Sequence, residues 1–293
     1  MHLRDFKPDA LLLLTAAIWG FAFVAQRAGM GPMGPFTFNG VRFAVGSVSL
    51  LPILIISEMR EAKCMSTGQG SDKRRLFGMG LAGLLLYLGA SFQQTGLVYT
   101  TAGKAGFITG LYVVLVPFLG ILFGKRTGLG TWSGAFLAFA GLYLLSVTEG
   151  FIMFFGDLLV LIGSFFWAGH VMVIGWLAPI IKPVRLAFFQ YVVCSSLSFV
   201  SAALSETFTL EGVYQALLPI LYCGLLSVGV AYTLQVVAQK DARPAHAAIL
   251  LSLEAVFAAI GGWMVLGETL LLRGIVGCFL MVSGMFLSQL ERL

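Results

Sequence analysis

Ten apolar segments, each about as long as a bilayer is thick, constrain the fold of this 293-residue chain more than any other feature. A helix needs about 20 mostly apolar residues to cross the ~30 Å hydrocarbon core. The alternating pattern of membrane β-strands is absent, and lipid offers no partners to exposed backbone groups. The sequence therefore predicts an all-α integral membrane protein with ten transmembrane helices. We place them at residues 10–29, 36–57, 76–97, 101–123, 129–148, 157–178, 184–204, 215–238, 245–266 and 270–289.

The composition excludes several classes of protein. Hydrophobic residues make up 59% of the chain and charged residues 11%, against about 45–50% and about 25% in soluble domains. The longest polar break, residues 58–75, is too short for a separate domain, so a binding site must be built inside the membrane. The four cysteines are far apart and form no CxxC pair, so we predict no metal site, no disulfide framework and no cofactor.

The distribution of positive charge predicts the orientation. Fourteen of the 18 Lys and Arg residues lie at the chain ends or in the loops after helices 2, 4, 6 and 8. Arg27 and Arg273 lie on the other side, and Arg42 and Lys104 lie inside helices. Cytoplasmic loops collect Lys and Arg. We therefore predict a multi-pass protein of the cell (inner) membrane with both termini in the cytoplasm, and the net charge of +5 does not indicate nucleic-acid binding.

The two halves of the chain resemble each other. LLLLTAAIWG (11–20) aligns with LVLIGSFFWA (159–168) at an offset of 148. Later in each half, TTAGKAGFITGL (100–111) aligns with RPAHAAILLSLE (243–254) at an offset of 143. Chance similarity between Leu- and Gly-rich helices is the alternative, but matched Trp and Gly positions keep their register across both stretches. We interpret the pattern as an internal repeat.

The repeat predicts an inverted architecture. The two domains would be residues 10–148 and 157–289, with five helices each. An odd number of helices means that the second copy enters the membrane from the opposite face. Secondary transporters with such inverted repeats bind substrate near the bilayer midplane between the halves, in a central cavity.

Two longer segments carry a resemblance to a known family. FQQTGLVYTTAGKAGFITGLYVVLVP (92–117) and AYTLQVVAQKDARPAHAAILLSLEAVFAAIGGWMVLGE (231–268) resemble the two repeat cores of the EamA-like family, part of the drug/metabolite transporter superfamily. The resemblance spans about residues 10–289. It implies ten helices and the movement, often the export, of small metabolites such as amino acids. One departure is Glu254-Ala255, where the family often has Glu-Pro, so this chain lacks that proline to break the helix.

Three ionisable residues lie inside predicted spans, where each costs about 2.5–3.5 kcal/mol to insert and marks a functional candidate. Glu254 is near mid-membrane, and we predict a proton-coupling or substrate-amine site; a structural tie between helices is the alternative. Arg42 could capture a carboxylate or phosphate with its planar donors, or clamp helices. Lys104 could be a cavity cation, or it could extend its amine to the outer interface.

Polar and aromatic residues near these three complete the candidate site. Gln93 and Gln94 are adjacent and point about 100° apart on a helix, so one of them can face a cavity squarely. For the aromatic residues, ordinary helix packing is the alternative to a wall for a cation or amphipathic solute. The predicted substrate-binding residues are Trp19, Asn39, Arg42, Gln93, Gln94, Thr101, Lys104, Tyr112, Trp167, Gln190, Tyr191, Tyr232 and Gln235.

A few further residues complete the prediction. Pro117 lies inside a span and is the expected hinge. His170 is expected in the core, and His246 is expected to be solvated beside a loop. Glycines repeat at seven in segments 129–148 and 270–289, which predicts peripheral packing helices. A homodimer through these two helices is a further expectation.

The predicted function is secondary-active or facilitative transport, in the export direction, of small metabolites such as amino acids or related polar or amphipathic compounds, by alternating access. A multidrug or nucleoside-type carrier of the same fold is the main alternative. The chain has no GxxxxGK[ST], HExxH or GxSxG motif, so we predict neither an ATP-driven pump nor an enzyme. A channel would suit a continuous polar stripe, whereas the polar residues here gather centrally. The predicted partners are the substrate and the lipid bilayer.

Overall fold

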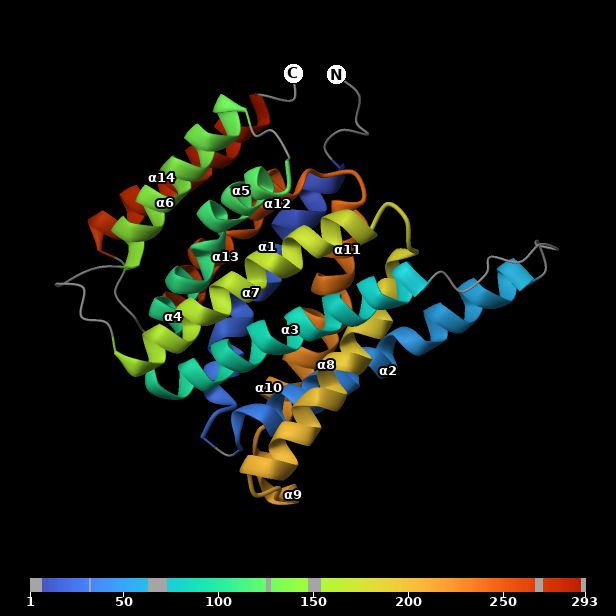
Figure 1. Cartoon of the computed structure of the whole chain (residues 1–293). Helices are drawn as coiled ribbons and strands as arrows, with labels where there is room; N and C mark the ends of the chain where they lie inside the picture. Colours follow the sequence, from blue (N-terminus) through green and yellow to red (C-terminus); the bar gives the residue numbers. More distant parts are fainter. Residues whose placement is uncertain are drawn as a thin grey trace.

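The computed structural model describes residues 7–31, 33–62, 73–124, 128–146, 154–266 and 271–290. These residues form helices joined by short turns (Figure 1). Cys64 and most of the polar break after the second predicted span lie outside the described residues. The helices are α1 (Lys7–Ala28), α2 (Pro35–Ala62), α3 (Lys73–Tyr99), α4 (Ala102–Gly110), α5 (Tyr112–Leu122), α6 (Leu129–Ser146), α7 (Phe155–Leu177), α8 (Pro183–Ser205), α9 (Leu210–Gln215), α10 (Leu217–Leu221), a π-helical segment η1 (Tyr222–Tyr232), α11 (Thr233–Gln239), α12 (Pro244–Leu251), α13 (Glu254–Leu266) and α14 (Leu272–Leu290).

The helices follow the predicted spans closely. Among the described residues, eight helical stretches are long and apolar enough to cross a membrane. The fifth and tenth predicted spans correspond to the shorter apolar helices Leu129–Leu145 and Leu272–Ser288. Pro35, Pro183 and Pro244 each begin a helix, where the fixed φ suits the first turn and the missing N–H leaves no bond unmade.

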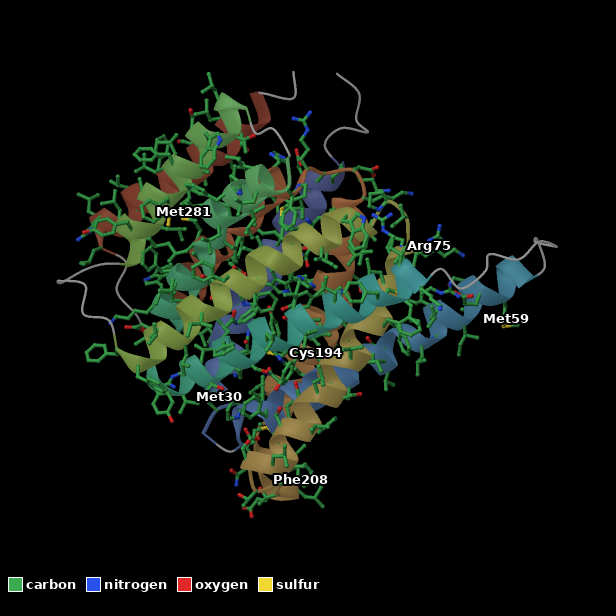
Figure 2. The ribbon with its side chains drawn as sticks, viewed as in Figure 1. Met30, Met59, Arg75, Cys194, Phe208 and Met281 are labelled. Carbon is green, nitrogen blue, oxygen red and sulfur yellow. The ribbon has the colours of Figure 1, made fainter. Side chains whose placement is uncertain are left out.

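The bundle exposes many large apolar side chains on its surface, and it buries polar side chains together with apolar ones inside. Figure 2 shows the side chains that project from its surface, among them Met59 and Phe208, each more than half exposed. Cys194 and Met281 are fully buried in the interior. The amides and carboxyls of several spans are also buried, including Glu254, which is 4% exposed. This distribution suits a lipid environment, because lipid cannot satisfy polar groups.

Helices α6 and α14 pack side by side in antiparallel directions (Figure 1). A Cβ on Gly134 would lie 2.6 Å from the carbonyl oxygen of Gly284, and one on Gly141 would lie 2.5 Å from that of Gly277. The glycines therefore let the two backbones touch. The glycine face of each helix is covered by the other helix of the same chain. A homodimer would therefore have to use the outer faces of the two helices.

Helices α2 and α8 are also antiparallel neighbours, and polar contacts join them at both ends. Glu58, near the end of α2, accepts a hydrogen bond of 3.0 Å from Arg185 at the start of α8. Glu206, directly after α8, accepts hydrogen bonds of 2.7 Å from the backbone N–H groups of Phe36 and Thr37 at the start of α2. A carboxylate is well placed there, because the first N–H groups of a helix lack intrahelical partners.

Two predicted spans are broken near their middles. One is divided into α4 and α5 at Leu111, six residues before Pro117. The other is divided into α12 and α13 at Ser252 and Leu253. This second break forms without a proline: Ser252 Oγ donates to the carbonyl of Ile249 at 2.8 Å, and the local backbone bonds shorten to an i→i−3 pattern. The missing Glu-Pro pair thus does not prevent the break. The hinge role of Pro117 stays a prediction.

The predicted span at 215–238 is less regular than expected. It contains α10, η1 and α11 in succession, and α9 ends at its first residue. Pro219 lies in α10, one turn before η1, and has no N–H to offer the preceding turn. π-Helical segments are rare and often occur at functional sites, and η1 contributes two residues to the cavity described below.

The glycine contact between α6 and α14 yields a stability prediction. We expect Gly141→Ala to lower the melting temperature of the purified protein in detergent, because the new methyl group meets backbone that cannot rotate away. The expected cost is about 1–3 kcal/mol, as for other overpacked sites. Gly80→Ala is the matched control, since a Cβ there has no neighbour within 4 Å. Equal melting temperatures for the two variants would contradict the close contact.

Candidate functional site

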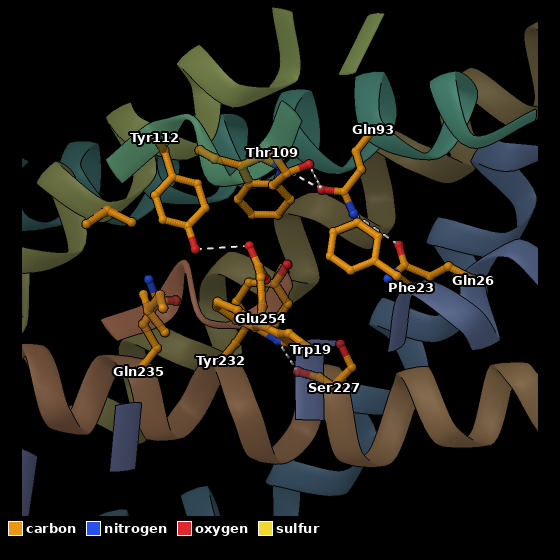
Figure 3. Close-up of a pocket in the computed structure, with 13 residues that line it drawn as sticks. Trp19, Phe23, Gln26, Gln93, Thr109, Tyr112, Ser227, Tyr232, Gln235 and Glu254 are labelled. Atoms are coloured by element: carbon orange, nitrogen blue, oxygen red, sulfur yellow. Dashed lines mark hydrogen bonds between the residues drawn. The ribbon is translucent and has the colours of Figure 1, made fainter. Parts of the chain in front are cut away.

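A cavity lies in the middle of the bundle, between helices from both halves of the chain (Figure 3). Its walls come from α1, α3, α4, α5, α7, η1, α11, α12 and α13. The lining residues are Trp19, Phe23, Gln26, Gln93, Thr109, Tyr112, Trp167, Val171, Ser227, Tyr232, Gln235, Leu251 and Glu254.

The carboxyl group of Glu254 lies at the centre of this cavity. Glu254 is the first residue of α13, so its side chain is placed by the helix break. The Tyr112 hydroxyl donates to Glu254 Oε1 at 2.9 Å, and Figure 3 shows the two side chains pointing toward each other. Tyr112 is itself the first residue of α5, beside the other break. One hydrogen bond therefore joins the midpoints of the two broken spans.

Aromatic rings form one wall of the cavity. The Trp19 and Tyr232 ring centroids are 4.5 Å apart, and Trp167 stacks on Tyr232 at 6.0 Å. Trp19 Nε1 donates to the carbonyl of Ser227 at 3.2 Å, so its ring is oriented by η1. Indole and phenol rings arranged in this way can hold a cation or a flat apolar group.

The opposite side carries a chain of amide hydrogen bonds centred on Gln93. Gln93 Oε1 accepts from Trp167 Nε1 at 2.9 Å and from Thr109 Oγ1 at 3.3 Å. Gln93 Nε2 donates to Gln26 Oε1 at 3.2 Å. This one side chain thus connects α1, α3, α4 and α7. Gln94 instead donates to the Gln26 carbonyl, away from the cavity.

The cavity is narrow, and its lining has one carboxyl group and no basic side chain. The volume that the centre of a water molecule can occupy is about 30 Å³, and one water needs about 10–15 Å³ on that measure. The space thus admits two or three waters and would have to widen for a metabolite. Among the lining residues, Glu254 alone is an acid, and none is a lysine, arginine or histidine.

The structure divides the predicted site residues into two groups. Seven of them line the cavity: Trp19, Gln93, Tyr112, Trp167, Tyr232, Gln235 and Glu254. The others do not line it: Asn39, Arg42, Gln94, Thr101, Lys104, Gln190 and Tyr191.

Arg42 is buried outside the cavity, with 1% of its surface exposed. Its Nε donates to Asn39 Oδ1 at 2.9 Å, and its guanidinium lies over the rings of Phe38 and Phe43 at 5.7 and 5.0 Å. These contacts hold Arg42 among the side chains of its own helix, α2, outside the cavity, and its role in substrate capture stays a prediction.

Gln190 and Tyr191 belong to the packing of α8. His170 Nε2 donates to Gln190 Oε1 at 2.8 Å, which places His170 in the core as expected. The hydroxyls of Tyr191 and Thr233 are 3.0 Å apart. Both α8 residues are fully buried against neighbouring helices, and they reach the cavity indirectly, through contacts such as that of Tyr191 with the Tyr232 ring.

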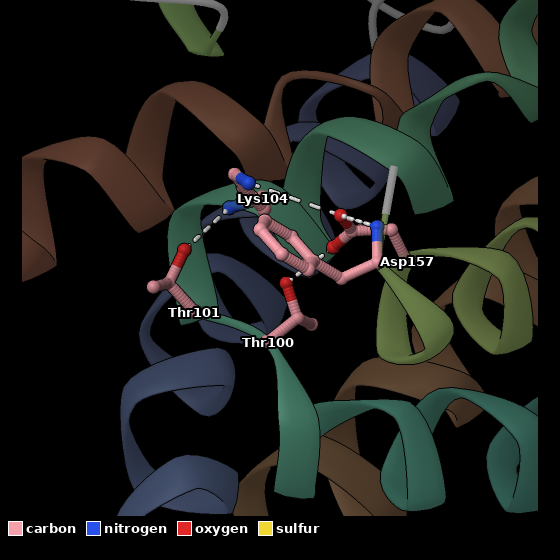
Figure 4. A network of polar contacts seen from close by, with 5 residues as sticks. Thr100, Thr101, Lys104 and Asp157 are labelled. Carbon is pink, nitrogen blue, oxygen red and sulfur yellow. Dashed lines mark hydrogen bonds and ion pairs between the residues drawn. The ribbon is translucent and has the colours of Figure 1, made fainter. Parts of the chain in front are cut away.

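Thr101 and Lys104 lie at one end of the bundle. The Thr101 hydroxyl accepts a hydrogen bond of 3.2 Å from the backbone N–H of Lys104 and caps α4. Lys104 Nζ lies 3.8 Å from an Asp157 carboxylate oxygen (Figure 4). Lys104 is therefore part of a contact between α4 and α7 rather than a cation of the cavity.

His246 does not match its predicted environment. It is 3% exposed, so the expectation of a solvated side chain was wrong. Its Nε2 lies 2.9 Å from Asp9 Oδ1, and its Nδ1 lies 3.1 Å from Ser288 Oγ. The loop before α12 is short, and α1 and α14 cover the imidazole. The position of His246 beside a loop in the sequence could not reveal this burial.

Several lining residues were not in the predicted set. Phe23, Val171 and Leu251 are ordinary apolar residues, and Ser227 carries no signal by itself. Gln26 offered a signal: an amide that follows Trp19 by seven residues lies on the same side of a helix. Thr109 likewise is a hydroxyl residue within an apolar span.

The Tyr112–Glu254 hydrogen bond can be tested by a double-mutant cycle. We expect Tyr112→Phe and Glu254→Gln each to change the free energy of unfolding in mixed micelles. Their coupling energy should be about 0.5–3 kcal/mol, as for groups in direct contact. The control cycle pairs Tyr112→Phe with Glu211→Gln, an exposed carboxylate on α9, and should be additive. A coupling energy of zero in the first cycle would mean that the contact adds nothing to stability.

The chain is similar in sequence to several known proteins. An uncharacterized transporter of Archaeoglobus fulgidus is 34% identical over 288 residues, which cover 97% of this chain and 86% of the relative. The uncharacterized transporter YoaV of Bacillus subtilis is 25% identical, with 94% of each chain covered. A WAT1-related protein of Arabidopsis thaliana is 23% identical, covering 98% of this chain and 90% of the relative.

A solved crystal structure supports the fold. It superposes with a TM-score of 0.76 at 18% identity and covers 97% of this chain and 96% of that one. The model of the EamA-like transporter family matches residues 6–147 and again residues 154–290, which confirms the resemblance read from the sequence. The chain is thus a multi-span membrane protein and belongs to the EamA-like transporter family.

Proposed function

We propose that this chain exports small amphipathic metabolites that carry an amino group, such as amino acids or related compounds, across the cell membrane by alternating access. Both termini are proposed to be cytoplasmic. The observation that carries the proposal is the central cavity, which places one carboxyl group among aromatic rings and neutral amides between the two halves of a membrane transporter.

Alternating access would rest on ten spans arranged as two inverted repeats. The sequence offset of 143 relates Gly134 to Gly277 and Gly141 to Gly284. If each glycine is replaced by its equivalent in the other half, the contact Gly134–Gly284 is converted into Gly277–Gly141, which is the second contact between the same two helices. A two-fold axis has this effect, because it exchanges the two halves. Because the equivalent helices α6 and α14 are antiparallel, the axis would lie in the membrane plane.

The contacts between α2 and α8 support the same relation. The offset of 148 relates Glu58 to Glu206 and Thr37 to Arg185. The pair Glu58–Arg185 therefore corresponds to the pair Glu206–Thr37, which is also bonded. Two pairs of equivalent helices thus exchange under one operation.

The proposed substrate chemistry follows from the cavity wall. Glu254 offers a negative group to an ammonium, and the rings of Trp19, Trp167 and Tyr232 suit the rest of an amphipathic molecule. Gln26, Gln93 and Gln235 offer neutral hydrogen bonds. Arg42 lies outside the cavity, so a substrate carboxylate would be held by these amides instead.

The same carboxyl group is our candidate for proton coupling. A proton and a substrate ammonium would compete for Glu254, and release of one on binding of the other gives antiport. Opening of the cavity would separate α5 from α13, and this separation would break the Tyr112–Glu254 hydrogen bond. Bending would occur at the two helix breaks and at Pro117, which lies six residues after the first break.

Counterflow in proteoliposomes tests the transport proposal. We expect saturable counterflow for amphipathic amines and amino acids, and little for carboxylic acids of the same size without an amino group. Saturable flux of neutral nucleosides alone would favour the alternative carrier. Absence of saturable flux across the whole panel, or single-channel conductance in planar bilayers, would contradict the proposal.

Glu254→Gln tests the role of the carboxyl group. We expect it to abolish substrate-driven proton flux and to weaken binding of an amine roughly 10- to 100-fold, the loss of one charge-assisted hydrogen bond of about 1.5–3 kcal/mol. Glu211→Gln is the matched control and should change neither. If Glu254→Gln retains coupled proton movement, the carboxyl group does not carry the coupling.

A further inference from the structure

We propose that Asp9 and Asp157 are paired gate residues that close the cavity at opposite ends of the bundle. This inference rests on the proposed alternating access and goes beyond it, because it assigns the contacts that hold each end shut. Both aspartates lie in the first turn of a helix, and both are buried.

Asp157 closes the end formed by α3, α4 and α7 (Figure 4). The Thr100 hydroxyl donates to Asp157 Oδ1, and Lys104 Nζ lies 3.8 Å from Oδ2. Oδ2 also accepts from the backbone N–H of Phe154 at 3.0 Å, which fixes the carboxylate at the start of its own helix. Asp157 is 1% exposed, although Lys104 is more than one-third exposed.

Asp9 closes the end formed by α1, α12 and α14. Its Oδ1 lies 2.9 Å from His246 Nε2, and the other ring nitrogen lies 3.1 Å from Ser288 Oγ. The Ser288 hydroxyl donates to the carbonyl of Met285 at 2.8 Å, so it is left to accept from the ring. A basic side chain at the start of a broken span thus contacts each aspartate: His246 contacts Asp9, and Lys104 contacts Asp157.

The two contacts occupy equivalent places in the two halves. The offset of 148 that aligns Trp19 with Trp167 takes Asp9 to Asp157. The offset of 143 takes position 103, beside Lys104, to His246. Each aspartate thus lies in the first turn of the first helix of its own half. Each contacts the beginning of the broken span in the other half. In Figure 1 the starts of α1 and α12 lie near the top, whereas α4 and the start of α7 lie at the lower left.

Each contact joins two spans that also line the cavity. Trp19 and Gln26 on α1 face the cavity with Leu251 on α12, and Trp167 on α7 faces it with Thr109 on α4. Separation of α1 from α12 would therefore open one end, and separation of α7 from α4 the other. Both contacts are formed in this structure, which agrees with the narrow cavity. A buried carboxylate without partners is costly, so an open end must expose its aspartate to water.

The experiment measures access to the cavity from each face of the membrane and needs no substrate. Ser227→Cys provides a reporter in the cavity, in a background where Cys64, Cys194, Cys223 and Cys278 are replaced. A membrane-impermeant maleimide is applied to right-side-out and to inside-out vesicles. We expect Asp9→Asn to raise labelling from the cytoplasmic face and lower it from the outer face. Asp157→Asn should do the reverse, with the ratio of the two rates changing roughly tenfold in each case.

Milder variants guard against misfolding, and a matched control tests for general loosening. Thr100→Val and Ser288→Ala remove one partner at each end and should shift labelling in the same opposite directions. Glu211→Gln should shift neither. Equal increases from both faces, or no change with the aspartate and milder variants, would overturn the gate assignment. Opposite shifts in labelling without any counterflow would support the gate assignment and contradict the proposed transport function. Counterflow without opposite shifts in labelling would contradict the gate assignment alone.

Discussion

The bilayer cannot hydrogen-bond to a protein, and the rest of this structure depends on that constraint. Every backbone group inside the membrane must find a partner within the protein, and a polar side chain there is costly unless it finds one within the bundle. Gln93 shows the result, because its amide is shared among four spans through Gln26, Thr109 and Trp167. The same constraint makes the carboxyl of Glu254 conspicuous: its one hydrogen bond to a side chain among the described residues comes from Tyr112, and it faces the cavity.

Apolar length and proline position predicted the helices well, because insertion into lipid depends on local sequence. The predicted spans and the observed helices agree within a few residues at most ends, as at Pro35 and Pro183. The internal break before Glu254 escaped prediction. It depends on the Ser252 hydroxyl and on a local change of hydrogen-bond pattern, and neither has a sequence signal as strong as a proline.

The site was predicted in part, and the misses have a common cause. Polarity in a span indicates that a residue is buried inside the bundle, but it does not tell a cavity from a helix contact. Arg42 and Gln190 satisfy the same sequence criterion as Gln93, yet they bond to Asn39 and His170 in packed interfaces. Asp9 and Asp157 were overlooked because they lie near predicted helix ends, where a charge is usually solvated. Their burial depends on helices that are more than 50 residues away in sequence.

The two broken spans differ in one chemical respect that has a consequence for motion. Six residues after Leu111, Pro117 has no backbone N–H, so the carbonyl of Val113 within α5 has no helical hydrogen bond to accept from it. Around Ser252 and Leu253 every residue keeps its N–H group, so a complete helical ladder is chemically available to that span. The span that holds Pro117 therefore lacks one helical hydrogen bond in any conformation, which gives the two broken spans unequal stiffness.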